Sequence, residues 1–359
     1  MVVVLGSSGS IGLNTLEVCK KFHIRVEALV VGNSIELLNK QIEEFQPKLV
    51  AVARKEDVAR VKHKRVYVGE EGILRLLEEC EAETVVNALV GFAGLKPTLK
   101  TLELGKKLAL ANKESLVVAG KFIDSSKITP IDSEHFALWY LVNHRPINRL
   151  YITASGGAFR DWDVEDIKDA TFADALKHPN WSMGNKITID SASMVNKLFE
   201  LLEARWLFGT TDIAAYIERT SMIHGLVEFK DGSTVAHLSY ANMQLPIAYA
   251  INGEVSEPIL EPLNLLELQS LKFNEIKEDR YPIWQIKEHL LANPDMGVVL
   301  NAANEEAIKR FESGEFGFFK MVELILKAYE EYKGVSAKSL EDVFGIDSEV
   351  REFTKVQNV

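Results

Sequence analysis

The chain has 359 residues, a length that at roughly 100–200 residues per domain predicts two or three domains with sizeable cores. Its composition is 47% hydrophobic and 26% charged, which is typical of a soluble globular protein and excludes a disordered or fibrous chain. With 52 acidic and 41 basic residues the formal charge is −11, so a broad surface for nucleic acid or for an anionic membrane is not expected.

The first third of the chain has the pattern of a parallel sheet. Residues 2–5 are a continuous apolar run, typical of a strand that is buried on both faces. Apolar residues at helical spacing follow from Ile11 to Phe22, and a β-branched run follows at 26–31, which completes a strand–helix–strand unit. Further apolar runs alternate with helical stretches, and this alternation predicts a doubly wound sheet; the runs lie at 49–53, 84–88 and 107–111.

The pattern changes after about residue 125. Residues 150–154 predict a strand that ends at Ser155-Gly156-Gly157, and residues 223–239 alternate around Asp231-Gly232, which is a hairpin signal. The middle of the chain is therefore predicted to be α+β. Three prolines mark 256–282 as a linker, and helical spacing dominates from residue 283 onward, over 298–311 and 318–332. A small helical domain is expected to close the chain.

The compartment is indicated by what the chain lacks. Its two cysteines, Cys19 and Cys80, are too few for a disulfide framework and lack metal-ligand spacing. No apolar run approaches the ~18–20 residues that cross a bilayer. Met1 leads directly into an apolar run, without the basic segment of a signal peptide. We therefore expect a cytoplasmic protein.

A glycine motif, Gly6-Ser-Ser-Gly9-Ser-Ile-Gly12, follows the first predicted strand. Small residues there allow a tight turn, which is the simplest interpretation, but the position at the front of a strand–helix–strand unit favours dinucleotide binding. Gly32-Asn33-Ser34 stands where an acidic residue usually binds the ribose of NAD. The missing acidic residue favours NADP over NAD. The preference is modest, because no arginine stands there to bind a 2′-phosphate.

Asp132-Ser133-Glu134 could supply carboxylates for a metal ion, with Glu200 as a third. In extended chain Asp132 and Glu134 would point the same way, and three carboxylate oxygens suit Mg²⁺ or Mn²⁺. The alternative is that Asp-Ser-Glu caps the helix that starts near His135, and spacing alone favours the cap. Lys197 stands three residues from Glu200 and Asn196 stands four, so an intrahelical ion pair is the simpler interpretation there.

The segment from His178 to Asn185 reads as a loop that carries Trp181 and Met183. It could be a lid that excludes water, or it could pin itself to the core through Trp181, and the residues alone favour the second. Other polar groups suit ligands at a strand end or around a phosphate, although each has an ordinary structural use; they are Asn112-Lys113-Glu114, Ser155-Gly156-Gly157, Ser191 and Lys197.

Taken together and in this order, the segments resemble the 1-deoxy-D-xylulose 5-phosphate reductoisomerase family. The matching segments are Gly-Ser-Ser-Gly-Ser-Ile-Gly at 6–12, Ala-Asn-Lys-Glu-Ser at 111–115, Asp-Ser-Glu-His at 132–135, Thr-Ala-Ser-Gly-Gly at 153–157, Lys-His-Pro-Asn-Trp-Ser-Met-Gly at 177–184, Asp-Ser-Ala at 190–192, Asn-Lys at 196–197 with Glu200, and Leu-Asn-Ala-Ala-Asn-Glu at 300–305. The resemblance covers nearly the whole chain. It reverses the preference for a helix cap and a pinned loop.

The resemblance implies conversion of 1-deoxy-D-xylulose 5-phosphate to 2-C-methyl-D-erythritol 4-phosphate, with NADPH and with Mg²⁺, Mn²⁺ or Co²⁺. It implies an α/β fold in four parts, and a homodimer. The expected parts are a Rossmann-like NADPH-binding domain at 1–125, an α+β catalytic and metal-binding domain at 126–255 with a flap at 178–185, a linker at 256–282 and a helical bundle at 283–359.

The resemblance also implies roles for individual residues. The metal ligands would be Asp132, Glu134 and Glu200. The catalytic residues would be Lys113, Glu134, His178 and Glu200. The substrate would also contact Ser133, Ser155, Trp181, Met183, Ser191, Asn196 and Lys197. The cofactor would contact Gly6, Ser7, Ser8, Gly9, Ser10, Ile11, Gly32, Asn33, Ser34, Asn112, Glu114 and Gly184.

Three positions depart from the family's pattern. Gly32-Asn33-Ser34 lacks the basic residue that often stands there, Glu218-Arg219-Thr220-Ser221 replaces His-Pro-Gln-Ser, and Ala158 replaces a proline.

Two rival functions are a dinucleotide sensor without catalysis, which needs no divalent-metal site, and an ordinary NADP-dependent dehydrogenase without a metal.

Overall fold

A computed structural model describes residues 1–268 and 270–358 of the protein. The chain forms two compact units. The first unit comprises residues 1–115, 123–136 and 242–261, and the second comprises 116–122, 137–241 and 262–359.

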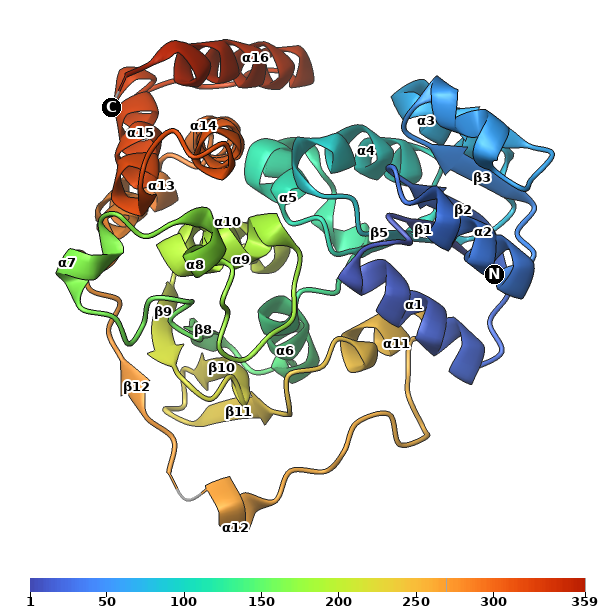
Figure 1. Ribbon diagram of the computed structural model, residues 1–359. Helices are drawn as coiled ribbons and strands as arrows, with labels where there is room; N and C mark the ends of the chain where they lie inside the picture. The colour runs from blue at the N-terminus through green and yellow to red at the C-terminus, as the bar shows by residue number, and fades with distance from the viewer. Residues whose placement is uncertain (269, 359) are drawn as a thin grey trace. The chain divides into compact units, whose positions relative to one another are not determined.

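The first unit contains a seven-stranded sheet with the order β4-β3-β2-β1-β5-β6-β7 (Figure 1). Every neighbouring pair in it is parallel, as the apolar runs predict. The strands are β1 (Val2–Leu5), β2 (Val26–Val31), β3 (Leu49–Val52), β4 (Val66–Val68), β5 (Thr84–Asn87), β6 (Lys107–Leu110) and β7 (Ile128–Pro130). Because β1 lies between β2 and β5, the connections diverge there, and such a switch point is where open α/β sheets bind ligands.

The first unit also contains helices. They are α1 (Ser10–Lys21), α2 (Ile35–Phe45), α3 (Gly69–Glu79), α4 (Leu95–Glu103) and α11 (Gln244–Asn252), while α5 (Glu114–Ala119) and α6 (Ser133–Leu141) begin in the first unit and end in the second. Helix α11 was not expected here. Its Ile247 and Ala248 are buried against Val18 of α1 and Val86 of β5, so this late segment completes the core of the first unit.

The second unit contains a mixed five-stranded sheet with the order β11-β10-β8-β9-β12. Its strands are β8 (Ile147–Ala154), β9 (Ile213–Glu218), β10 (Ile223–Phe229), β11 (Thr234–Leu238) and β12 (Phe273–Asn274). Strands β8 and β9 are parallel, and the other pairs are antiparallel. The predicted hairpin is confirmed as β10–β11, with Gly232 at a φ of +85° in its turn.

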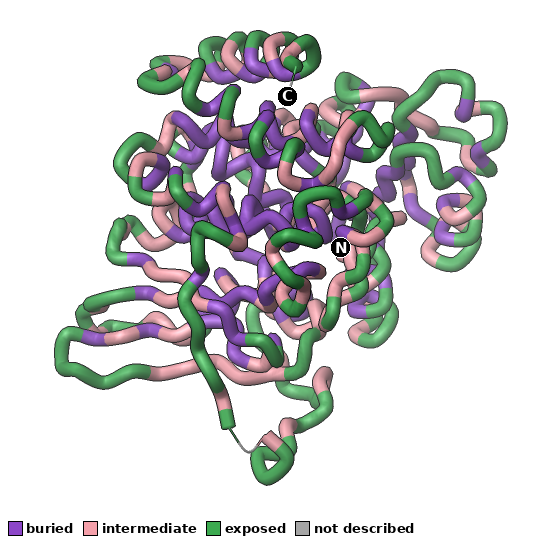
Figure 2. Tube along the Cα trace, turned by 60° about the vertical axis from the view of Figure 1, so that its left-hand side comes forward, coloured by how far each residue is buried: buried purple, intermediate pink, exposed green. Residues whose placement is uncertain are grey.

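Helices of the second unit include α10 (Val195–Phe208), whose residues 195–204 are all buried. In the predicted helical region α14 (Met296–Glu312) packs against α15 (Phe318–Glu331) and α16 (Leu340–Val356). The remaining helices are α7 (Val164–Ile167), α8 (Phe172–Ala175), α9 (Asn185–Ser193), α12 (Leu265–Leu268) and α13 (Lys287–Ala292). Residues 252–264 and 270–275 are mainly exposed (Figure 2). Among the described residues no helix has both the length and the apolar character to cross a membrane.

Candidate active site

The predicted glycine loop follows β1 at the switch point of the first sheet. Gly6 has a φ of +85°, and a Cβ there would lie 2.5 Å from the carbonyl oxygen of Ala88. A Cβ on Gly12 would lie 2.2 Å from the carbonyl oxygen of Gly6, so the loop folds back on the first turn of α1 only with glycine at both positions. No side chain caps the N-terminus of α1. The loop therefore has the backbone of a pyrophosphate site, with Ser8, Gly9, Ser10 and Ile11 leading into the helix.

The predicted contact residues around the loop differ in what their side chains can reach. Ser7 is buried, and its hydroxyl donates to Oε1 of Gln41 at 2.7 Å. This hydrogen bond ties the glycine loop to α2. Gly32, Asn33 and Ser34 are exposed after β2, and a Cβ on Gly32 would meet nothing within 4 Å. This strand end therefore has open space for a ribose and bears no carboxylate, as the sequence indicates.

Asn112 follows β6 and is buried. Its amide donates to the carbonyl oxygens of Leu89 and Gly91, both at 2.8 Å. The side chain thus links the segments that follow β5 and β6. Asn112 lies at a strand end, where the cofactor site is predicted, but its amide group already binds the protein backbone. Glu114 begins α5 and is also buried.

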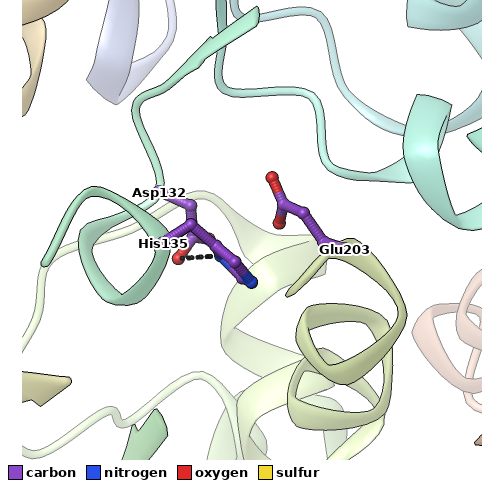
Figure 3. Close-up of side chains that lie close together, drawn as sticks. All are labelled: Asp132, His135 and Glu203. Carbon is purple, nitrogen blue, oxygen red and sulfur yellow. Dashed lines mark hydrogen bonds and ion pairs between the residues drawn. The ribbon is translucent and has the colours of Figure 1, made fainter. Parts of the chain in front are cut away.

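Asp132 is a buried carboxylate of the first unit with two partners. It forms an ion pair with Nζ of Lys113, and its Oδ1 lies 3.3 Å from Nδ1 of His135 (Figure 3). Burial by itself raises the pKa of Asp132, but the Lys113 ammonium and His135 hold it well below its usual range. Oδ1 also accepts from the backbone N–H of Glu134 at 3.3 Å. The helix cap that spacing alone favours is therefore present, although the family resemblance had reversed that preference, and the cap leaves a charged carboxylate beside Glu134.

Glu134 lies at the start of α6, where its Oε2 accepts from the hydroxyl of Ser133 at 2.7 Å. Ser133, Glu134 and Asp132 thus form one short polar segment at the entrance to the helix. Within the first unit the structure brings together Lys113, Asp132 and Glu134, which the sequence assigned to one site.

Helix α10 carries the predicted residues of the second unit. Met194, in a left-handed conformation with a φ of +71°, separates α9 from α10. Glu200 accepts from Nδ2 of Asn196 at 2.5 Å and forms an ion pair with Nζ of Lys197, which also donates to the carbonyl oxygen of Thr153. Both members of this pair are buried. The predicted intrahelical pair is confirmed, and because these groups are buried, Glu200 has fixed partners.

Ser155 and His178 are in direct contact. The Ser155 hydroxyl lies 2.8 Å from Nε2 of His178 and accepts from the N–H of Gly157 at 3.1 Å. Nδ1 of His178 accepts from the N–H groups of Asn180 and Trp181, so the proton of the neutral ring is on Nε2. Burial, with the Arg160 and Lys197 cations, lowers the pKa of His178 to about 4. Since the Ser155 oxygen accepts twice, its own proton is available to a ligand.

Gly157 sets the position of this serine relative to α9. Its φ is +69°, and a Cβ would lie 2.6 Å from the carbonyl oxygen of Ser191. The loop therefore packs directly on the backbone that bears Ser191, whose hydroxyl donates to the carbonyl oxygen of Ile187 at 2.8 Å. The neighbouring Asp190 is bound by Lys186 and by Asn304 of α14.

The predicted flap, residues 178–185, has neither helix nor strand before Asn185 begins α9. Trp181 and Met183 are half-buried, whereas Ser182 and Gly184 are exposed. The Trp181 ring meets the edge of His224 at a centroid distance of 6.2 Å. The segment thus combines anchoring contacts with exposed residues, as a movable cover would.

Four residues in this region were not singled out from the sequence. Glu203 is a buried carboxylate on α10 (Figure 3). It follows Glu200 by three residues, and this helical spacing could have indicated from the sequence that the two carboxylates lie on the same side of the helix. His135 stood in a quoted motif but received no role. Asn180 and Arg160 contact partners far along the chain, so no local pattern could have revealed them.

Three family profiles match the chain. They describe 1-deoxy-D-xylulose 5-phosphate reductoisomerase at residues 2–120, its C-terminal domain at 128–208, and the DXP reductoisomerase C-terminal domain at 238–353. The 1-deoxy-D-xylulose 5-phosphate reductoisomerase of Nautilia profundicola is 56% identical over 360 residues, which covers 98% of both chains. That of Wolinella succinogenes is 51% identical and covers 98% of this chain and 99% of its own.

Solved structures agree with these relatives. A DOX-P reductoisomerase in complex with NADPH, fosmidomycin and magnesium has a TM-score of 0.92 and 31% identity, covering 98% of this chain and 97% of that one. The Zymomonas mobilis enzyme in complex with NADPH has a TM-score of 0.88 and 31% identity, covering 99% and 97%.

Proposed function

The chain belongs to the 1-deoxy-D-xylulose 5-phosphate reductoisomerase family, and we propose that the residues described above carry out this family's reaction. The reaction is the NADPH- and divalent-metal-dependent conversion of 1-deoxy-D-xylulose 5-phosphate to 2-C-methyl-D-erythritol 4-phosphate. The observation that carries the assignment of residues is the set of carboxylates, Asp132 and Glu134 at the start of α6 and Glu200 on α10, each flanked by polar groups suited to a sugar phosphate.

The donor set fits the metal. Asp132, Glu134 and Glu200 each offer a carboxylate oxygen, the ligand type that Mg²⁺ and Mn²⁺ prefer. When bound, the cation polarises the substrate's carbonyl and neighbouring hydroxyl oxygens and offsets the negative charge that develops during the rearrangement. Lys113 and Lys197 pair with Asp132 and Glu200 and place positive charge beside these two carboxylates.

The remaining residues bind and cover the substrate. Ser155 donates its hydroxyl proton to a substrate oxygen, because His178 keeps its oxygen occupied as an acceptor. Ser133, Ser191, Asn196 and Lys197 complete the polar contacts to the hydroxyl and phosphate groups. Trp181 and Met183 close over the bound molecule and exclude water from it.

The cofactor lies along the glycine loop of the first unit in this proposal. The backbone of residues 6–11 faces the pyrophosphate, and Gly32-Asn33-Ser34 accommodates the ribose. Asn112, Glu114 and Gly184 are the other proposed cofactor-binding residues. The open space at Gly32 supports this placement.

The functional division is proposed at the boundaries given from the sequence, namely 1–125, 126–255, 256–282 and 283–359. A homodimer is supported by the exposed apolar side chains of Leu265, Leu266 and Phe273. A cytoplasmic location is supported by two free, buried thiols.

The test follows NADPH oxidation at its near-ultraviolet absorbance with 1-deoxy-D-xylulose 5-phosphate. The reaction is run with Mg²⁺, Mn²⁺ or Co²⁺, and again after chelation and metal return. Oxidation that is lost on chelation and restored by the metal supports the proposal. Oxidation that persists after chelation would favour an ordinary dehydrogenase, and NADPH binding without any turnover would favour a sensor.

A further inference from the structure

Asn180 of the flap makes two hydrogen bonds to a distant turn. Its Nδ2 donates to the carbonyl oxygen of Arg219 at 2.8 Å and to the hydroxyl oxygen of Ser221 at 2.7 Å. Both acceptors lie between β9 and β10, in residues 218–221, which we call the 218–221 turn. These bonds join the flap to the end of the sheet through the side chain of one residue.

Glu218 holds this turn in shape. The residue is 1% exposed, and its carboxylate accepts from the N–H of Thr220 at 2.9 Å and from that of Met222 at 3.0 Å. The Thr220 hydroxyl donates to it as well, at 2.7 Å. Ser221 has a φ of +56°, an unusual conformation for a residue with a side chain. With its own N–H groups drawn inward to Glu218, the turn presents the Arg219 carbonyl and the Ser221 hydroxyl to Asn180.

Arg160 connects the 218–221 turn to residues 155–157, which we call the Ser155 loop. Its Nη1 donates to the carbonyl oxygen of Arg219 at 2.8 Å and to that of Ser155 at 3.0 Å. Arg219 in turn forms an ion pair with Asp161. The flap is therefore held at two points, by His178 on the Ser155 loop and by Asn180 on the turn, and Arg160 fixes the two anchors to each other.

We propose that Asn180 is a positioning residue, which holds the flap against the Glu218-organised turn and so sets how tightly the substrate is bound. The inference rests on the proposed function, because it assumes that the flap covers the substrate. Asn180 acts through the flap and is not assigned a contact with the reacting atoms. Without these two bonds the free protein has a less ordered flap. Substrate binding must then order the flap, and this entropic cost lowers the binding affinity.

The first test needs neither substrate nor NADPH. Hydrogen–deuterium exchange of peptides covering 178–185 is compared for the wild-type protein, Asn180→Ala and Asn180→Asp. Loss of two ordinary hydrogen bonds should raise exchange in the flap about fivefold or more. Exchange in α10 should stay unchanged. Asn180→Asp should match or exceed Asn180→Ala, because it places an acceptor against the Arg219 carbonyl. Unchanged flap exchange in both variants would overturn the inference and leave the proposed function intact.

The second test separates positioning from general damage. In steady-state assays Asn180→Ala should raise the KM for 1-deoxy-D-xylulose 5-phosphate about five- to tenfold and keep kcat within about twofold. A fall in kcat at unchanged KM would contradict a positioning role. If the wild-type protein has no turnover, the proposed function fails, while the exchange result still decides whether Asn180 holds the flap.

The turn itself provides a third test. Glu218→Gln keeps the shape of the side chain but replaces one acceptor by a donor, so it should raise flap exchange and KM in the same direction as Asn180→Ala. A double-mutant cycle between Asn180→Ala and Ser221→Ala should be non-additive, since each variant removes the same bond. Full additivity, with flap exchange unaltered in Glu218→Gln, would show that the turn does not hold the flap.

Discussion

Helix α10 and the flap contribute neighbouring groups to one half of the candidate site, but they hold them differently. Asn196, Lys197 and Glu200 project from a helix whose residues 195–204 are all buried, whereas the flap has neither helix nor strand over 178–184. The helix is positioned by its core, and the flap by a few polar bonds to Ser155 and the 218–221 turn. Altering a group on α10 should therefore change chemistry in an intact scaffold, and altering the flap should change binding by degrees.

The largest effect is expected at Glu200. Glu200→Gln removes a negative charge from the donor set, so kcat should fall about 10²–10³-fold and its dependence on Mg²⁺ should weaken, while NADPH binding changes little. The melting temperature should fall as well, because the buried Lys197 ammonium loses its charged partner. Steady-state kinetics and NADPH fluorescence titration measure this. Glu288→Gln, at an exposed carboxylate, is the control and should behave as wild type. Unchanged turnover in Glu200→Gln would remove Glu200 from the site.

Gly157→Ala tests the rigid support beneath Ser155. The added Cβ meets the Ser191–Ala192 backbone at 2.6 Å and is strained at a φ of +69°. Its matched control is Gly209→Ala, which has a similar φ of +63° but nothing within 4 Å of the new Cβ. We expect the free energy of unfolding, measured with denaturant, to fall by about 3 kcal/mol in Gly157→Ala and by about 1 kcal/mol in the control. Equal losses would mean that the loop can move away from α9.

Trp181→Ala should act on binding. Loss of the ring that meets His224 should raise the KM for the sugar phosphate about tenfold, or roughly 1.4 kcal/mol, with a smaller fall in kcat. Trp181→Phe keeps an aromatic edge at this position and should recover most of the affinity. Kinetics of Trp181→Ala that match wild type would make Trp181 a packing residue only, as its pattern in the sequence first suggested.

Another expected effect, similar in size to that of Trp181→Ala, is a pH dependence of the flap. Burial, with the Arg160 and Lys197 cations, lowers the pKa of His178 from 6.5 to about 4, so the surroundings of the ring in the anchored flap favour its neutral form. Above pH 6.5 the ring is neutral whether the contact is made or broken, and the contact is at full strength. As the pH falls from 6.5 toward 4, the released ring takes up a proton and the contact weakens by about 1–2 kcal/mol, with allowance for partial exposure.

The pH effect is measured as the stability of wild type minus that of His178→Gln between pH 4 and 8. This difference should be level above pH 6.5 and should shrink below it. A difference that does not vary with pH would show that His178 is not held neutral by its contacts.

Much of α10 and little of the flap could be predicted from the sequence. The spacing of Asn196, Lys197 and Glu200 places them together on one helix, because their contacts are local. The glycine loop and the parallel sheet follow from strand and turn signals in the same way. Asn180 and its acceptors at 219 and 221 are joined only by tertiary structure, and no periodicity relates them.

Some residues at predicted sites have structural uses that spacing could not separate from function. The Ser7 hydroxyl binds Gln41, and the Asn112 amide binds two backbone carbonyls, so both side chains stabilise the local fold in addition to any contact that they make with the cofactor. Asp132 is both the predicted helix cap and a paired carboxylate. Glu218 replaces a histidine of the family pattern and organises a turn through contacts that only the folded chain reveals.

The most direct measurement of the central claim is Mn²⁺ binding, followed by electron paramagnetic resonance, to the wild-type protein, Asp132→Asn and Glu200→Gln. Both carboxylates are proposed as ligands of one cation, which predicts one strong site in wild type and at least about tenfold weaker binding in each variant. If either variant binds Mn²⁺ as tightly as wild type, that carboxylate is not a ligand and the assignment of this site is wrong.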